Sequence, residues 1–148
     1  MTTRDQQRER LYRSERPLRS HSPEFTTVKE CQDYVNLVTR TSWWKKWHQY
    51  NTPIEVQDGR GRRSACASHG CEISLPLWSR QKVVIFHELA HTIIQSIPED
   101  YAAHGPEFAA VFINLVYRFL GNGMYQRLKA SFKEHRVRYR LPKELISR

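Results

Sequence analysis

The chain has 148 residues with a formal net charge of +9, and 39% of them are hydrophobic. This length suits one domain, and the hydrophobic content excludes a chain that is disordered throughout. The sequence has no apolar run long enough to cross a bilayer, no apolar segment of a signal peptide near its start, and only three cysteines, too few for a disulfide framework. We therefore expect a soluble, cytoplasmic protein with reduced thiols and no contact with a membrane.

The positive charge gathers at the two ends of the chain. Residues 1–20 contain six arginines against three acids, and residues 129–148 contain seven lysines or arginines against two acids. We predict a basic N-terminal arm or short helix over 1–20, a folded domain over 21–134 and a basic C-terminal tail over 135–148. The basic ends could contact nucleic acid or an acidic partner, or they could be solvated arms that contribute only solubility.

The folded domain is predicted to begin with a helix. Thr27 and Glu30 have the spacing of a capping box, and apolar residues then recur at helical intervals up to Val38. The segment SWWKKWH that follows mixes tryptophans with lysines, a combination that could stack on nucleic-acid bases. Because Trp43 and Trp47 are four residues apart, we favour packing of these rings in the core.

Residues 53–76 change from a helical to an alternating apolar pattern, with turn signals at Asp58-Gly59 and at Gly70. This pattern predicts a three-stranded, mostly antiparallel sheet. The apolar positions of the alternating segments are Ile54, Val56, Ile73 and Leu75.

The segment 79–97 is predicted to be a buried helix that carries the motif HELAH. Residues i and i+4 of a helix project from the same face, so His87 and His91 can bind one metal ion while Glu88 flanks it. Three polar groups on so apolar a helix would be costly to bury without a shared partner, and a metal ion supplies that partner. Zinc suits these ligands, and a catalytic zinc site keeps a position for a water molecule that Glu88 could deprotonate.

A third ligand is available 13 residues after His91. His104 comes just before Pro106, which suits the first turn of the next helix, so its imidazole can face back towards the pair. Glu107 is the competing ligand, because a carboxylate from a later helix also completes zinc sites. We favour His104 and assign Glu107 to the first turn of its helix, where an acid interacts with the helix dipole.

Two further helices are predicted after this loop. An apolar stripe from Phe108 to Phe119 ends at Gly121, and Tyr125 and Leu128 belong to a shorter helix behind it. The basic tail could then form an edge strand or stay mobile.

The residues around both motifs resemble known families. HELAH followed by HGPEF resembles the SprT-like zincin metallopeptidases, in which a third histidine arrives in an H-G-x-x-F context. Through TRDQQRERLYRSE, ISLPLWSR before VVIFHELAH, and HGPEF, most of the chain is also similar to a small family of metallohydrolases found in actinobacteria and their phages. The resemblance implies a compact zincin-like domain, zinc held by His87, His91 and His104, and Glu88 as general base. The SprT-like link would imply action on DNA-bound proteins, but the chain lacks the cysteine zinc ribbon that some of those proteins append.

Together these observations predict an α+β fold in which the sheet packs against the active-site helix and two to three further helices. The predicted function is that of a zinc-dependent metallopeptidase acting on a peptide or protein, with strand 71–75 aligning an extended substrate at the sheet edge. Glu99 and Asp100 are candidates for orienting the histidines, and Tyr101 for stabilising the oxyanion.

Two other functions stay open at this point. One is a noncatalytic module that binds nucleic acid or protein and contains a structural zinc ion. The other is a metal-dependent hydrolase that acts on a non-peptide substrate.

Overall fold

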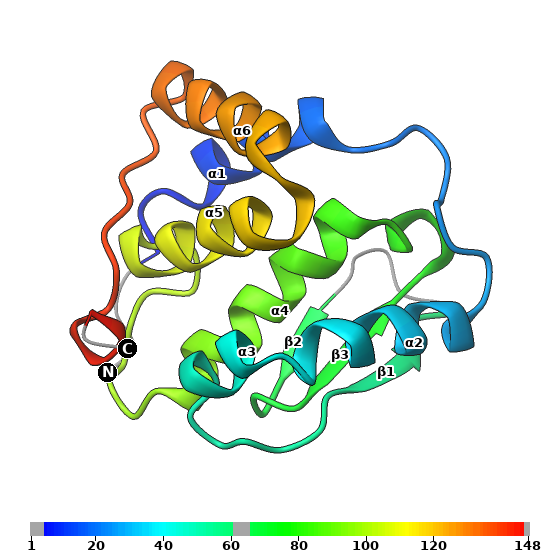
Figure 1. The fold of residues 1–148 in the computed structure, drawn as a ribbon. Helices are drawn as coiled ribbons and strands as arrows, with labels where there is room; N and C mark the ends of the chain where they lie inside the picture. Colours follow the sequence, from blue (N-terminus) through cyan, green and yellow to red (C-terminus); the bar gives the residue numbers. More distant parts are fainter. Residues whose placement is uncertain (1–4, 61–65, 147–148) are drawn as a thin grey trace.

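The computed structural model of the protein describes residues 5–60 and 66–146. Figure 1 shows α1 and α6 on one side of α5, α4 in the middle of the molecule, and the sheet with α2 and α3 on the other side. The helices and strands of the described residues are α1 (Arg8–Glu15), α2 (Val28–Thr39), α3 (Ser42–Trp47), β1 (Glu55–Asp58), β2 (Cys66–Ser68), β3 (Glu72–Leu75), α4 (Lys82–Ser96), α5 (Pro106–Leu120) and α6 (Asn122–Glu134).

The predicted capping box at the start of α2 is confirmed. Thr27 is the N-cap residue, and its hydroxyl oxygen accepts a hydrogen bond of 3.1 Å from the backbone N–H of Glu30. The Glu30 carboxylate in turn accepts hydrogen bonds from the hydroxyls of Thr26 and Thr27. The first of these bonds satisfies a backbone N–H that the first turn of a helix leaves without an intrahelical partner.

The tryptophans of α3 pack in the core, as the sequence predicts. Trp44 and Trp47 are buried, and the ring of Trp43 stacks on that of Trp47 with 4.4 Å between centroids. Trp43 also meets the ring of Phe119 in α5 edge to face. The helix is therefore held by the aromatic surface that could otherwise have formed a stacking platform.

The predicted mostly antiparallel sheet is wrong. The strand order is β1-β3-β2, in which β1 pairs with β3 in parallel and only the three-residue β2 pairs with β3 in an antiparallel way. Strand β3 thus lies in the centre of the sheet, so its predicted role in aligning a substrate at an edge is also wrong. The surrounding domain is more helical than expected, with six α-helices in the described part of the chain.

Strands β1 and β3 end side by side, and their ends approach closely. Asp58 lies opposite Leu75, so Gly59 follows β1 beside the point where Pro76 follows β3. A Cβ atom on Gly59 would lie 2.5 Å from the backbone nitrogen of Pro76, so only glycine allows this approach. An alternating apolar pattern reports which face of a strand is buried but not which strand is its neighbour.

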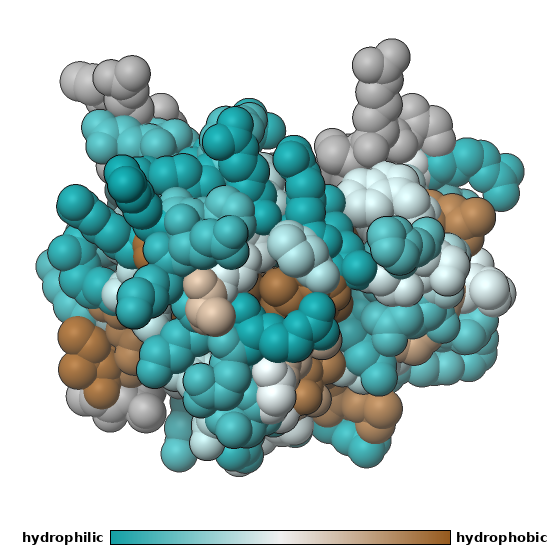
Figure 2. Space-filling view, turned by 90° about the horizontal axis from the view of Figure 1, so that it is seen from above, coloured by the Kyte–Doolittle hydropathy of each residue, from teal (hydrophilic) through white to brown (hydrophobic). Residues whose placement is uncertain are grey.

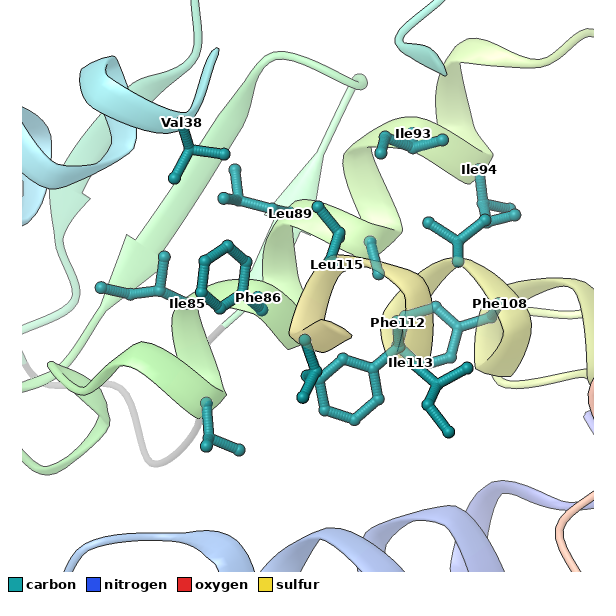
Figure 3. Packing of buried hydrophobic residues seen from close by; sticks show 14 of the residues in the cluster. Val38, Ile85, Phe86, Leu89, Ile93, Ile94, Phe108, Phe112, Ile113 and Leu115 are labelled. Atoms are coloured by element: carbon teal, nitrogen blue, oxygen red, sulfur yellow. The ribbon is translucent and has the colours of Figure 1, made fainter. Parts of the chain in front are cut away.

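Helices α4 and α5 form the centre of the hydrophobic core. Leu89 and Ile93 of α4 and Phe108, Phe112 and Leu115 of α5 belong to one hydrophobic cluster, and all five are fully buried (Figure 3). Helix α4 begins at Lys82, later than the predicted residue 79, because the chain first forms a 3₁₀ turn over Leu77–Ser79. Helix α5 ends at Leu120, and its C-cap residue is Gly121, whose φ of 90° suits glycine.

The two ends of the chain pack together. The Ser131 hydroxyl of α6 donates a hydrogen bond of 2.7 Å to the backbone oxygen of Ser14 in α1. The side-chain amide of Gln7 bonds both backbone polar groups of Arg138. Within residues 135–146 the tail forms no strand; it runs beside the start of α5, where the Arg140 N–H donates to the carbonyl of Pro106.

The face formed by α1 and α6 is mostly hydrophilic in the space-filling view (Figure 2). Among the residues that the structure describes, no helix combines the length and apolar character needed to span a membrane. The exposed basic residues of α1 and α6 include Arg10, Arg13, Arg127, Lys129 and Lys133.

Because Leu11 anchors α1 in the core, shortening this side chain should destabilise the whole domain. Leu11 of α1 has no exposed surface, whereas Leu37 of α2 is 50% exposed. We expect Leu11→Ala to lower the free energy of unfolding by about 2–5 kcal/mol, and Leu37→Ala to change it by no more than about 0.5 kcal/mol. Urea unfolding of the metal-free protein measures both values. Equal effects would show that α1 does not belong to the cooperative core.

Candidate metal centre

The structure brings three histidines together. His87 and His91 lie one turn apart on α4, and His104 comes from the loop that leads into α5. One ring nitrogen of each lies within 4.8 Å of the others, and the Nε2 atoms of His91 and His104 are 3.2 Å apart. Nitrogen ligands of a tetrahedral zinc site lie about 3.3 Å from one another, given bond lengths of about 2.0–2.1 Å. In the described part of the chain, this is the only such group.

The chemistry of these nitrogens fits a metal ion. The Nε2 atom of His87 is buried and has no hydrogen-bond partner among the described residues. A buried polar atom without a partner is costly, and a metal ion at the common point would bond it. The three histidines can therefore hold one metal ion through nitrogen atoms that face each other.

Aromatic packing fixes the histidine rings from the α5 side. The ring of Phe108 stacks on His91 with 4.3 Å between centroids and meets His87 and His104 at 5.0 and 5.2 Å. Phe108 is fully buried, so its ring cannot move without disturbing the core. The helix pair α4 and α5 thus holds the ligand rings in place.

Helix α1 supplies the carboxylate that orients His87. The Nδ1–H of His87 donates a hydrogen bond of 2.9 Å to Oε1 of Glu15, and both side chains are buried. The second oxygen of Glu15 accepts from Arg19 at 2.5 Å. With Nδ1 engaged in this way, Nε2 of His87 is the atom left for a metal ion.

Asp5 holds His104 in the same manner. One carboxylate oxygen of Asp5 accepts a hydrogen bond of 2.8 Å from Nδ1 of His104, and the other accepts the backbone N–H of the same residue at 3.0 Å. The residues predicted to orient the histidines, Glu99 and Asp100, instead line a cavity of about 950 Å³ beside the C-terminal tail. The orienting pair comes from the N-terminal segment, where the sequence shows only acids scattered among arginines.

The Glu15 and His87 pair is coupled electrostatically. Burial opposes the charge on Glu15, but the charges and hydrogen bonds of His87 and Arg19 outweigh it and lower the pKa of Glu15. Burial likewise opposes a charge on His87, yet the ion pair and hydrogen bond with Glu15 raise the pKa of this imidazole. Glu15 therefore stays ionised and makes His87 a more basic ligand.

The other two imidazoles favour the neutral form that binds metals. Burial, together with the charges of His87 and His104, lowers the pKa of His91 well below its ordinary value. Burial also lowers the pKa of His104, although its hydrogen bond to Asp5 acts in the opposite direction. A neutral imidazole keeps the lone pair that a metal ion needs.

Glu88 is a buried acid next to His87. It follows His87 on α4, is only 4% exposed, and makes no hydrogen bond with any described residue. Burial raises the pKa of Glu88 to about 7, and the nearby charge of His87 offsets this effect in part. A cation held by the histidines would favour the ionised carboxylate further.

The competing candidates from the sequence are engaged elsewhere. Glu107 accepts two hydrogen bonds from Arg140, at 3.0 and 3.2 Å, and does not belong to the histidine group. The Tyr101 hydroxyl donates a hydrogen bond of 2.6 Å to Glu144. The tyrosine that does contact the histidines is Tyr12 of α1, which the sequence did not single out.

The ligand set can be tested with cobalt(II) as the probe, because its visible absorption reports nitrogen ligands. We expect His104→Ala to weaken binding by more than about 100-fold, a loss beyond that of an outer partner, and Glu107→Gln to leave the affinity unchanged. Titration of each variant, with circular dichroism as the check on folding, measures the effect. If Glu107→Gln weakened cobalt binding to this extent and His104→Ala left it unchanged, Glu107 would be the third ligand.

The orienting carboxylates should affect affinity through the histidines they hold. We expect Glu15→Gln and Asp5→Asn each to weaken cobalt binding by about 10- to 100-fold. Glu9→Gln is the matched control, since Glu9 is an exposed acid of α1. Glu15→Gln also removes the ion pair with Arg19 and could therefore weaken the fold. Asp5→Asn leaves that ion pair intact, so its effect on affinity reports the orientation of His104 alone. Unchanged affinity in both variants would contradict the role assigned to these acids.

Comparison of the chain with protein-family models, with curated proteins and with solved structures finds no match. The resemblance to SprT-like peptidases therefore stays a prediction from the sequence. The structure itself shows a set of three histidines, two of them buried and one half-buried, that could hold a metal ion.

Proposed function

We propose that the protein is a zinc-dependent hydrolase, and that its substrate bond is an amide, most simply a peptide bond. His87, His91 and His104 would hold the zinc ion, and Glu88 would act as general base. Three protein nitrogens with one position left for water are typical of catalytic zinc sites, whereas structural sites are closed by four protein ligands.

The observation that carries this proposal is the position of Glu88. A carboxylate that is almost wholly buried and has no hydrogen bond in the described part of the chain destabilises the fold. Its neighbour on α4 is a candidate ligand, so its position beside the histidines suits proton transfer at that centre. A general base explains why an acid occupies this site where an apolar residue would pack better.

Each residue of the proposed site then has a defined task. When bound, zinc would supply the positive charge that polarises a carbonyl group and lowers the pKa of a water molecule. Glu88 accepts the proton of the attacking water and later passes it to the leaving nitrogen. Glu15 and Asp5 keep His87 and His104 oriented, and Phe108 packs against the imidazole rings.

The proposal is tested with Glu88→Gln, which keeps the size of the side chain but removes the base. We expect the zinc-loaded variant to keep its metal and to lose about 10²- to 10⁴-fold in kcat, measured on a library of quenched fluorescent peptides. Glu99→Gln, which changes an exposed acid in the loop between α4 and α5, should retain full activity.

Two results would overturn the proposal. Cleavage by Glu88→Gln at the rate of the wild-type protein would remove Glu88 from the chemistry. Absence of any cleavage by the zinc-loaded wild-type protein, across peptides and unfolded proteins, would exclude a peptidase and favour a structural zinc ion or a non-peptide substrate.

A further inference from the structure

Helix α1 places an aromatic ring directly against two of the three candidate ligands. The ring of Tyr12 stacks on that of His87, with 5.2 Å between centroids and 25° between planes. It also lies against His104, with 5.0 Å between centroids. Tyr12 is thus in contact with the metal centre although it is 75 or more positions away from these ligands in the sequence.

The position of this ring is fixed from several sides. Leu11 and Glu15 of the same helix are fully buried, and Glu15 is bonded to His87. The guanidinium groups of Arg8 and Arg19 lie 5.7 and 6.0 Å from the centre of the Tyr12 ring. The contacts that hold the candidate ligands therefore also hold Tyr12.

The hydroxyl group of Tyr12 is not needed for any of these contacts. Ring stacking and interaction with arginine would serve equally well with phenylalanine. The hydroxyl makes no hydrogen bond with the described residues, whereas Tyr101 uses its hydroxyl to bond Glu144. Tyr12 thus carries an unengaged hydrogen-bond donor beside the candidate ligands.

We propose that the Tyr12 hydroxyl is the donor that stabilises negative charge on the substrate oxygen during hydrolysis. This inference rests on the proposed function. As the water oxygen bonds the amide carbon, the π-electron pair of the carbonyl moves to its oxygen, and Glu88 takes the water proton. Tyr12 donates a hydrogen bond to that oxygen and keeps its own proton. When the carbon–nitrogen bond breaks, the carbonyl re-forms, and the nitrogen receives the proton from Glu88.

Charges of both signs lie near Tyr12. Arg8 is exposed, whereas Arg19 is partly buried and its guanidinium is bonded to the Glu15 carboxylate. Burial and the carboxylates of Glu88 and Glu15 raise the pKa of Tyr12, and the two arginines offset this only in part, so the hydroxyl keeps the proton that it would donate. The attraction for an anion would then come from the bound metal ion and this hydroxyl, and the metal-loaded site should bind a small tetrahedral oxyanion even where no peptide is cleaved.

Tyr12→Phe tests the role in catalysis. We expect the zinc-loaded variant to lose about 10²- to 10³-fold in kcat, with little change in KM and none in metal affinity, because the ring that packs on the histidines is retained. Tyr101→Phe is the matched control and should keep the activity of the wild-type protein. An unchanged kcat in Tyr12→Phe would overturn the proposal.

A second measurement does not depend on peptide cleavage. Inorganic phosphate is titrated into the cobalt-loaded protein and followed by the visible spectrum of the metal. We expect Tyr12→Phe to weaken phosphate binding by about tenfold, with Tyr101→Phe unchanged. Equal binding by Tyr12→Phe and wild type, or no binding by the wild-type protein, would overturn the role of Tyr12. A wild-type protein that binds phosphate through Tyr12 but cleaves no peptide would instead refute the peptidase function alone.

Discussion

The buried hydrogen bond between Glu15 and His87 is the interaction on which the candidate metal centre depends. A carboxylate with no exposed surface is tolerated only when both oxygens are satisfied, and here His87 bonds one and Arg19 the other. The bond also fixes the tautomer of His87, because Nδ1 carries the proton and Nε2 faces the other histidines. It joins α1 to α4, and so makes the N-terminal helix part of the site.

The centre is built almost wholly from helices. Helix α4 contributes two histidines and Glu88, the entrance of α5 contributes His104, and the α1 region contributes the carboxylates of Asp5 and Glu15. Among the described residues no candidate ligand comes from the sheet, whose edge strand β2 packs against α4. The rigid packing of α4 on α5 therefore sets the distances between ligands, while α1 sets the orientation of the rings.

Features that depend on residues close together in the chain could be predicted from the sequence. The capping box at Thr27, the spacing of His87 and His91, and the Pro106 start that places His104 all depend on contacts within a few turns. The parallel pairing of β1 with β3 could not be read, because alternation does not identify a neighbouring strand. The roles of Asp5, Tyr12 and Glu15 were also missed, since nothing local marks a residue that acts on a histidine 72 to 99 positions later.

The long separation between these acids and their histidines has a consequence for assembly of the protein. Asp5 and Glu15 are synthesised first, and at about 5–20 residues per second roughly 4–14 s pass before the ribosome adds His87, 72 residues after Glu15. During this interval α1 has neither its buried partner nor the α5 and α6 surfaces on which it packs. The histidines of the growing chain are therefore not yet held in their final orientation. A metal ion should bind tightly only after α1 has packed on the nearly complete domain.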